Sequence, residues 1–236
     1  TGMFEAASKA DLDTVGGRGK WFWESGIIYF AATDGGDATT KRYEARVRNT
    51  LKHSNGSIRL TRIDTYFSSS EGGLFSGVST QREDCKTFGN YYNGFSDNAN
   101  TTLSYRDESG GNGNDGFNGT VTAYNDSNDD TTRLEAVYFD PYGHDNDDDG
   151  LSDHYRGDVT IYGGLFEYNT KADVVHVTGA ACVCYNTVAR GTLNGFYAAT
   201  ATTGDTTRVK TSFRCVNTIA YNNTYSYRAA DDAVLD

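Results

Sequence analysis

The sequence predicts an all-β protein whose C-terminal half is a β-solenoid, and three observations lead to this prediction. Apolar and polar residues alternate repeatedly over residues 157–236, and period-two alternation puts one set of side chains on one face of a strand. Each run lasts about 4–8 residues and ends in a cluster of Gly, Asn, Asp or Thr, which is typical of strands joined by turns. Residues 171–177 and 230–236 are also alike, since each has small and acidic residues that lead into an apolar pair. Short strands that recur with similar turn chemistry indicate stacked rungs.

The N-terminal part, residues 1–140, predicts an irregular β-rich region. Residues 4–12 carry a weak helical signal, and residues 21–30 form an aromatic, β-prone block suited to cap one end of a solenoid. Residues 89–130 are rich in Asn, Gly, Asp, Ser and Thr, so we expect irregular turns or a long surface loop there. Residues 141–236 then hold the rungs, either as a second domain or as the continuation of one solenoid.

Within the rungs, the alternation predicts which side chains face the interior. Val175 and Val177 are expected to point inward, with His176 between them pointing outward. Ile219 is expected inside for the same reason, so that Val175→Asp or Ile219→Asp would bury an unpaired charge. The other expected interior residues are Val159, Ile161, Cys182, Cys184, Phe213 and Cys215.

Four cysteines, Cys85, Cys182, Cys184 and Cys215, are interpreted as small buried hydrophobic residues stacked inside the coil. Cys182 and Cys184 share one face of a strand, and Cys215 falls on a neighbouring rung. A zinc site would need a fourth ligand, which no familiar spacing supplies nearby. A disulfide from Cys85 to one of the others stays open.

The charge of the chain excludes some partners. Its 236 residues carry a net charge of −11, and the pI is about 4.7. A nucleic-acid backbone needs Lys and Arg to displace counterions, so we expect no nucleic-acid partner. We expect no membrane insertion either, because no run of 18 apolar residues exists. The chain ends inside a predicted strand, so we expect it to be a fragment of something larger.

An aspartate-rich string predicts a calcium site. Residues 145–153 read Asp-Asn-Asp-Asp-Asp-Gly-Leu-Ser-Asp, with acidic residues and a glycine at the spacing of a calcium loop. Arg156 stands where an EF-hand has its bidentate Glu, so the spacing is closer to the short loops of thrombospondin type 3 repeats. The alternative is an acidic surface loop without a metal. The candidate calcium ligands are Asp145, Asp147, Asp149, Leu151 and Asp153.

The side-chain composition is compatible with a carbohydrate ligand. Rings of the 17 tyrosines stack on sugars, and Asn and Asp side chains bond hydroxyl groups, although interior stacks would use the same residues. Asp173 and the pair Asp231 and Asp232 stand at equivalent points of the two similar segments, and Arg208 and Lys210 share one strand face. These five are the candidate glycan-binding residues. The alternative, which we favour for the aspartates, is that they cap turns.

Three segments carry a family resemblance. They are Asp-Gly-Leu-Ser-Asp-His at 149–154, Gly-Asp-Val-Thr-Ile-Tyr-Gly-Gly at 157–164 and Ala-Asp-Val-Val-His-Val at 172–177. Together they resemble the right-handed parallel β-helix of bacteriophage tail spike and tail fibre proteins, and more broadly the pectate-lyase-like solenoids. The resemblance covers about residues 145–236. It departs from the polygalacturonase-type enzymes, because Gly-His-Gly is absent and Arg208-x-Lys210 precedes Asp231-Asp232, so it assigns no catalytic residue.

The resemblance implies a right-handed parallel β-helix in a trimeric protein that is extracellular or part of a virion. Such a protein binds, and in some members cleaves, a host-surface polysaccharide. A structural and receptor-binding part of a phage tail appendage is therefore the expected function. Two alternatives stay open: a polysaccharide lyase or glycoside hydrolase on the same scaffold, and a calcium-stabilised extracellular structural or filament protein.

Overall fold

The computed structural model describes residues 4–5, 10, 20–24, 27–30, 51–120, 134–154, 157–177, 181–199, 211–230 and 233–236. The chain divides into two compact units, residues 1–46 and residues 47–236, which are taken separately below. Among the described residues there is no α-helix, and no helix could therefore span a membrane.

The first unit contains a three-stranded sheet. Strand β1 (Phe4–Glu5) runs parallel to β2 (Lys20–Glu24), which forms an antiparallel pair with β3 (Ile27–Phe30). The aromatic block is thus two strands, as its β-branched and aromatic residues predict. The helical prediction is wrong at Phe4 and Glu5, because their pairing with β2 overrides a weak local propensity.

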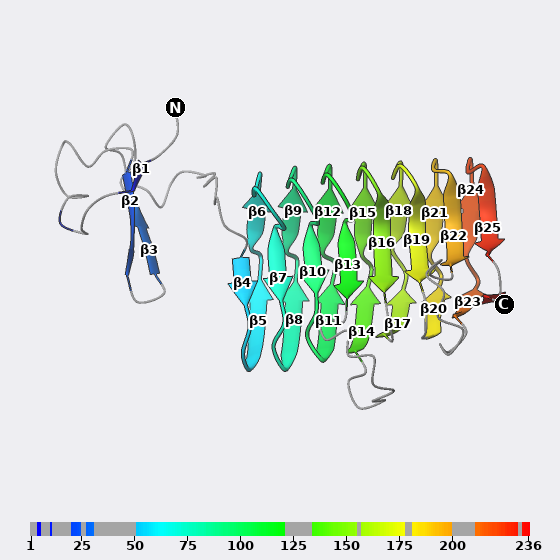
Figure 1. The fold of residues 1–236 in the computed structure, drawn as a ribbon, viewed down its shortest axis with the longest axis horizontal. Helices are drawn as coiled ribbons and strands as arrows, with labels where there is room; N and C mark the ends of the chain where they lie inside the picture. Colours follow the sequence, from blue (N-terminus) through cyan, green and yellow to red (C-terminus); the bar gives the residue numbers. More distant parts are fainter. Residues whose placement is uncertain are drawn as a thin grey trace, which may run out of the picture. The chain divides into compact units, whose positions relative to one another are not determined.

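The second unit is a right-handed parallel β-helix of three parallel sheets with eight, eight and seven strands (Figure 1). Sheet 1 contains β4 (Leu51–His53), β7 (Gly73–Phe75), β10 (Phe95–Asp97), β13 (Phe117–Thr120), β16 (Asp149–His154), β19 (Ala172–Val177), β22 (Asn194–Ala199) and β25 (Tyr225–Ala229). Sheet 2 contains β5 (Ser57–Thr61), β8 (Ser79–Glu83), β11 (Thr101–Tyr105), β14 (Leu134–Phe139), β17 (Gly157–Tyr162), β20 (Ala181–Tyr185), β23 (Ser212–Val216) and β26 (Val234–Leu235). Sheet 3 contains β6 (Asp64–Tyr66), β9 (Lys86–Phe88), β12 (Glu108–Gly110), β15 (Tyr142–His144), β18 (Leu165–Glu167), β21 (Val188–Arg190) and β24 (Ile219–Tyr221).

The predicted solenoid is confirmed, and its regular rungs begin at Leu51, well before residue 141. The irregular structure predicted for residues 89–130 is wrong where the chain is described, because β10 to β13 continue all three sheets. The sequence pattern did not indicate these rungs because many of their interior residues are polar. Thr80, Thr102, Ser104 and Ser109 are buried there, so the strands lack apolar alternation.

An asparagine ladder fixes the corner between sheet 3 and sheet 1. The side-chain amide of Asn90 donates to Asn112 Oδ1 (2.8 Å), that of Asn112 to Asn146 Oδ1 (2.8 Å), and that of Asn146 to Asn169 Oδ1 (2.9 Å). All four side chains are buried, and each bond satisfies a polar group that burial would otherwise penalise. The ladder keeps successive corners in register, so side chains just after it recur at the same place on every rung.

The interior is apolar toward the C-terminus. Val159, Ile161 and Phe213 are buried as predicted. Cys182 and Cys184 are buried in the same cluster, and Cys184 lies beside Cys215 on the next rung. All four cysteines, Cys85 included, are free thiols, which agrees with their interpretation as stacked hydrophobic residues.

Four inward and outward assignments on these strands need correction, including that of Val177, which packs with Val175 outside the core. His176 is fully buried, and its Nδ1 lies 3.1 Å from Asp153 Oδ2. Val174 joins the interior cluster, and Val175 therefore faces the other side of the sheet, where it is buried in a separate small cluster. Ile219 is 57% exposed, because its neighbour Ala220 packs on the core instead. A shift of one residue exchanges the two faces of a strand.

Candidate functional site

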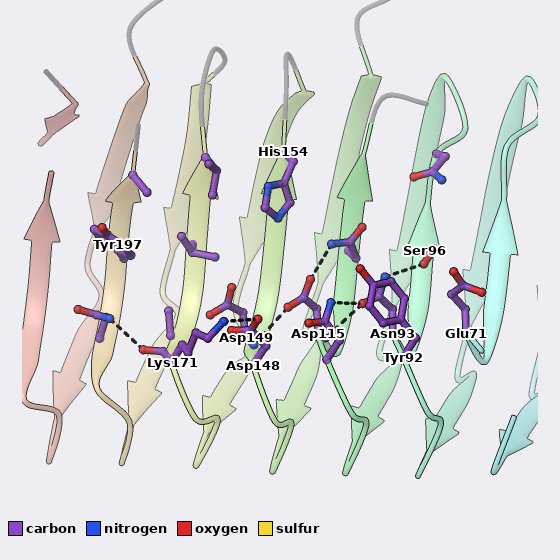
Figure 2. Close-up of a pocket in the computed structure, with 18 of the residues that line it drawn as sticks. Glu71, Tyr92, Asn93, Ser96, Asp115, Asp148, Asp149, His154, Lys171 and Tyr197 are labelled. Atoms are coloured by element: carbon purple, nitrogen blue, oxygen red, sulfur yellow. Dashed lines mark hydrogen bonds and ion pairs between the residues drawn. The ribbon is translucent and has the colours of Figure 1, made fainter. Parts of the chain in front are cut away.

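A groove of about 670 Å³ runs along the outer side of sheet 1, close to the asparagine corner (Figure 2). Residues from six successive strands line it, from Leu74 on β7 to Tyr197 on β22. Neighbouring strands lie about 4.8 Å apart, so five spacings give a length of roughly 24 Å. The groove therefore crosses the rungs and follows the axis of the solenoid.

The rung repeat sets the lining of the groove. The residue that begins the sheet 1 corner lines the groove on five successive rungs, and in order along the axis these residues are Asn93, Asp115, Asp149, Ala172 and Asn194. Asp149 pairs in register with Ala172, and Ala172 with Asn194. Along the groove, this position of the repeat thus changes from amide to carboxylate to methyl and back to amide.

Toward its β7 end, where Glu71 also lines it, the groove has an amide segment, which consists of Asn93, Ser96, Asn98, Asn114 and Asn118 (Figure 2). Asn114 donates to Asn93 Oδ1 (2.7 Å), and Asn93 donates to Ser96 Oγ (3.0 Å). Tyr92 lies at this end and is 48% exposed. The segment offers an ordered row of polar groups beside an accessible aromatic ring.

The middle of the groove is an acidic segment, formed by Asp115, Asp148 and Asp149, whose carboxylate oxygens lie within 4.8 Å of one another. Asp115 accepts a bond from Asn118 (2.6 Å), and Lys171 Nζ donates to Asp148 Oδ2 (2.6 Å). Burial and then the neighbouring Asp115 and Asp148 raise the pKa of Asp149 to about 8. Burial above all, with Asp148 contributing, raises the pKa of Asp115 to about 7. At pH 7 Asp149 is therefore mostly protonated and Asp115 about half protonated.

His154 also lines the groove, from the end of β16. Its Nε2 lies 2.7 Å from Ser152 Oγ. Burial lowers the pKa of His154 below its usual 6.5, so the ring is neutral at pH 7. It adds hydrogen-bonding capacity to the groove without adding positive charge.

The end nearest β22 is an apolar segment, which consists of Ala172, Val175, Val177, Tyr197 and Ala199. Val175 is only 3% exposed although it faces away from the solenoid core. Arg228 on the last rung lies over the Tyr197 ring, 5.0 Å from its centroid. Tyr92 and Tyr197 thus place one tyrosine toward each end of the groove, with the acidic segment between them (Figure 2).

The five residues of the expected calcium loop do not come together. Asp145 is exposed and pairs with His144 (2.8 Å), Leu151 is in the core, and Asp153 faces His176 inside the coil. Asp147 is exposed. Only Asp149 reaches the acidic segment, where its partners are Asp148 and Asp115. A corner in this region turns consecutive side chains in different directions, so a spacing rule for calcium loops does not apply.

The acidic segment has the donors that suit a hard cation. Its three carboxylates offer oxygen ligands, which calcium prefers, and it is the one such group among the described parts of the chain. Lys171 already neutralises Asp148 in part. Calcium would have to compete with that ammonium group and with the protons on Asp115 and Asp149.

Of the five candidate glycan-binding residues, the structure describes only Asp173. Asp173 is fully buried, accepts a bond from the side-chain amide of Asn169 (2.9 Å) and does not line the groove. The remaining four, Arg208, Lys210, Asp231 and Asp232, lie outside the described residues.

Sequence reasoning missed Asp115 and both tyrosines of the groove. A repeated dipeptide marks the acidic position, because Asn93, Asp115, Asp149 and Asn194 are each followed by glycine and then by Phe or Leu. Asn93 and Asp115 are 22 residues apart. Alignment of the chain on this dipeptide would have placed Asp115 and Asp149 side by side.

No family model, no curated protein and no solved structure matches this chain.

Proposed function

We propose that the protein is a carbohydrate-binding β-helix whose groove holds a host-surface polysaccharide. The observation that carries this proposal is the groove itself, which crosses six strands along the solenoid axis. A linear polymer can lie along such a groove and meet a new set of side chains at each rung. A compact small molecule would use only a part of it.

The lining supports a sugar ligand. Tyr92 and Tyr197 offer ring faces at the two ends, and aromatic rings stack on the apolar faces of sugars. Between them the groove presents amide groups and carboxylates, which bond hydroxyl groups from fixed positions. The combination of ring platforms and an ordered polar row favours an oligosaccharide over an apolar peptide.

The sequence resemblance extends the proposal to the setting. In a phage tail appendage the β-helix would be a structural rod, outside the cell or on the virion, that attaches to the surface glycan of a host. Such appendages are trimers, so we expect a homotrimer in solution. Sedimentation equilibrium measures this directly, and a monomer at micromolar concentration would remove the trimer from the proposal.

The binding proposal is tested with labelled polysaccharides of bacterial surfaces, by titration of the parent and two variants. Tyr92→Ala and Tyr197→Ala each remove a ring from the groove and are expected to weaken binding about fivefold, since stacking is worth on the order of 1 kcal/mol. Tyr185→Ala is the matched control, because Tyr185 stacks on Tyr162 on the outside of sheet 2. Equal loss in all three variants, or no loss in any, would contradict the groove as the site.

A hydrolase is the second candidate function, and the raised pKa values of Asp115 and Asp149 favour it. A glycosidase needs one protonated carboxyl as acid and one ionised carboxylate near the scissile bond. Asp149 would serve as the acid and Asp148 or Asp115 as the carboxylate. New reducing ends in the same titrations, lost in Asp149→Asn while binding persists, would make the protein an enzyme. Binding without new ends would leave it an adhesin.

A further inference from the structure

The charges along the groove restrict what it can hold. Among the described residues that line it, four are acidic, Glu71, Asp115, Asp148 and Asp149, and one is a cation, Lys171. Lys171 donates to Asp148 (2.6 Å), so the charge of the one cation is offset by one of the four acids. Arg228 lies beside the last rung of the groove, where it stacks on Tyr197 and bonds Asn194 (3.2 Å).

We infer that the groove takes an uncharged polysaccharide with methyl-bearing sugars, such as N-acetylated or deoxy sugars, and excludes polyanions. This inference rests on the proposed function and names the substrate class of the same site. A polyanion that follows the axis must pass the acidic segment, because that segment lies between the amide and apolar segments. Like charges brought together at a binding site reject a ligand even when its shape fits.

The two ends of the groove complement an uncharged sugar in different ways. The amide segment offers donors and acceptors without net charge. In the apolar segment Ala172 and Val175 are already buried, so the surface that a ligand could cover belongs to Val177, Tyr197 and the neighbouring Leu193. Covering this apolar surface favours an acetyl or deoxy methyl group over a bare hydroxyl. One polymer with both polar and methyl-bearing groups would satisfy the whole length.

Deprotonation of the acidic segment strengthens the discrimination against polyanions at high pH. Burial and like charge hold the pKa of Asp115 at about 7 and that of Asp149 at about 8. The other charged groups facing them are Asp148 and Lys171, and His154 is the nearby titratable ring. Near pH 6 the two aspartates are mostly neutral, and by pH 9 both carry charge. An anionic polymer should therefore bind less well as pH rises, whereas an uncharged polymer should change less.

The test compares two polymers with the same backbone: oligogalacturonate, which is anionic, and its fully methyl-esterified form, which is uncharged. Oligomers of N-acetylglucosamine serve as a second uncharged probe. We expect the ester to bind more than about tenfold tighter than the acid at pH 9 and low salt, a ratio that shrinks at pH 6. It should also shrink at about 0.15 M salt, because salt screens the partly exposed part of the repulsion.

The double variant Asp115→Asn, Asp149→Asn keeps the size of both side chains and removes both charges. It is expected to bind the acid form better than the parent does at pH 9 and to lose the pH dependence of the ratio. Asp140→Asn is the matched control, since Asp140 lies in the exposed turn between β14 and β15 and does not line the groove. Melting curves of the three proteins check that each is folded.

The possible outcomes distinguish failure of the inference on substrate class from failure of the proposed function. If the acid binds as tightly as the ester at pH 9, the inference is wrong while the groove remains a glycan site. If the double variant leaves the ratio unchanged, the carboxylates are not the cause and the inference fails as well. If none of the three probes and none of the surface polysaccharides binds, the proposed function itself fails.

Discussion

Asn169 donates its side-chain amide to Asp173 Oδ1 (2.9 Å), and this bond ends the asparagine ladder. Asp173 occupies the corner position that glycine holds on neighbouring rungs, as at Gly150 and Gly195. A Cβ at Gly150 would lie 2.7 Å from the amide nitrogen of Asn169 on the next rung, so the ladder requires glycine there. On the rung after Asp173, Thr192 stands in place of an asparagine. Its smaller side chain leaves room for the carboxyl group of Asp173, and it has no side-chain amide with which Asn169 could continue the ladder.

The first prediction concerns pH. Burial raises the pKa of Asp173 from 3.8 to about 8. A carboxyl with a raised pKa in the folded state contributes stability when protonated, and this stability is lost as pH rises from about 4 to about 8. Asp115 and Asp149 act in the same direction. Urea denaturation at pH 5 and pH 8.5 should show a less stable protein at the higher pH.

The Asp173→Asn variant tests the assignment to this residue. The asparagine keeps the acceptor for Asn169 and does not titrate, so part of the difference between pH 5 and pH 8.5 should disappear. The matched control is Asp147→Asn, which changes an exposed aspartate. A variant with the full pH dependence of the parent would show that Asp173 is not responsible.

A second prediction concerns the buried Arg82. Its Nε donates to Asp107 (2.9 Å) and its Nη2 to Asp97 (2.9 Å), and Tyr138 also donates to Asp97 (2.9 Å). Arg82→Met would leave two carboxylates buried without their cation, and loss of one partner of a buried ion pair costs about 3–5 kcal/mol. Chemical denaturation measures the loss.

Two further variants make this result specific. Adding Asp97→Asn and Asp107→Asn to Arg82→Met removes the stranded charges and should recover part of the stability. Arg106→Met removes an exposed pair with Asp84 and should change little. Similar losses of stability for Arg82→Met and Arg106→Met would mean that burial of the Arg82 network adds nothing to its contribution to stability.

A third prediction separates two residues that the sequence treats alike. Val175→Asp would place a charge where 3% of the side chain is exposed, and it should destabilise the protein by several kcal/mol. Ile219→Asp changes a residue that is 57% exposed and should have an effect within about 0.5 kcal/mol. Thermal melting compares them, and equal melting temperatures would contradict the assigned faces of β19 and β24.

A fourth prediction concerns calcium at the acidic segment. Binding to the folded state alone raises stability, so millimolar calcium should raise the melting temperature of the parent at pH 8.5, and a chelator should reverse the rise. The effect should be absent in Asp148→Asn, Asp149→Asn and kept in Asp145→Asn, because Asp145 lies outside the segment. An equal rise in melting temperature in both variants would show that calcium binds outside the acidic segment.

The groove could be predicted only in part. Asp149 was found because it stands in a conspicuous acidic string, and aromatic and amide side chains, which the sequence suggested for a glycan site, do line the groove. Asp115 was missed because its partner Asp149 is 34 residues away. The step from Asn90 to Asn112 is 22 residues, whereas the step from Asn112 to Asn146 is 34, so a fixed repeat fails at this rung.

By itself the sequence determined that the chain forms short parallel strands in a solenoid, because alternation and turn residues act within a few neighbouring residues. It also determined that Cys182, Cys184, Val159 and Ile161 are inside. Only the tertiary structure decided that His176 faces Asp153 in the core and that Asp115 meets Asp149 in a groove. Those contacts join residues on different rungs, and their register depends on the length of each coil and on the ladder that aligns the corners.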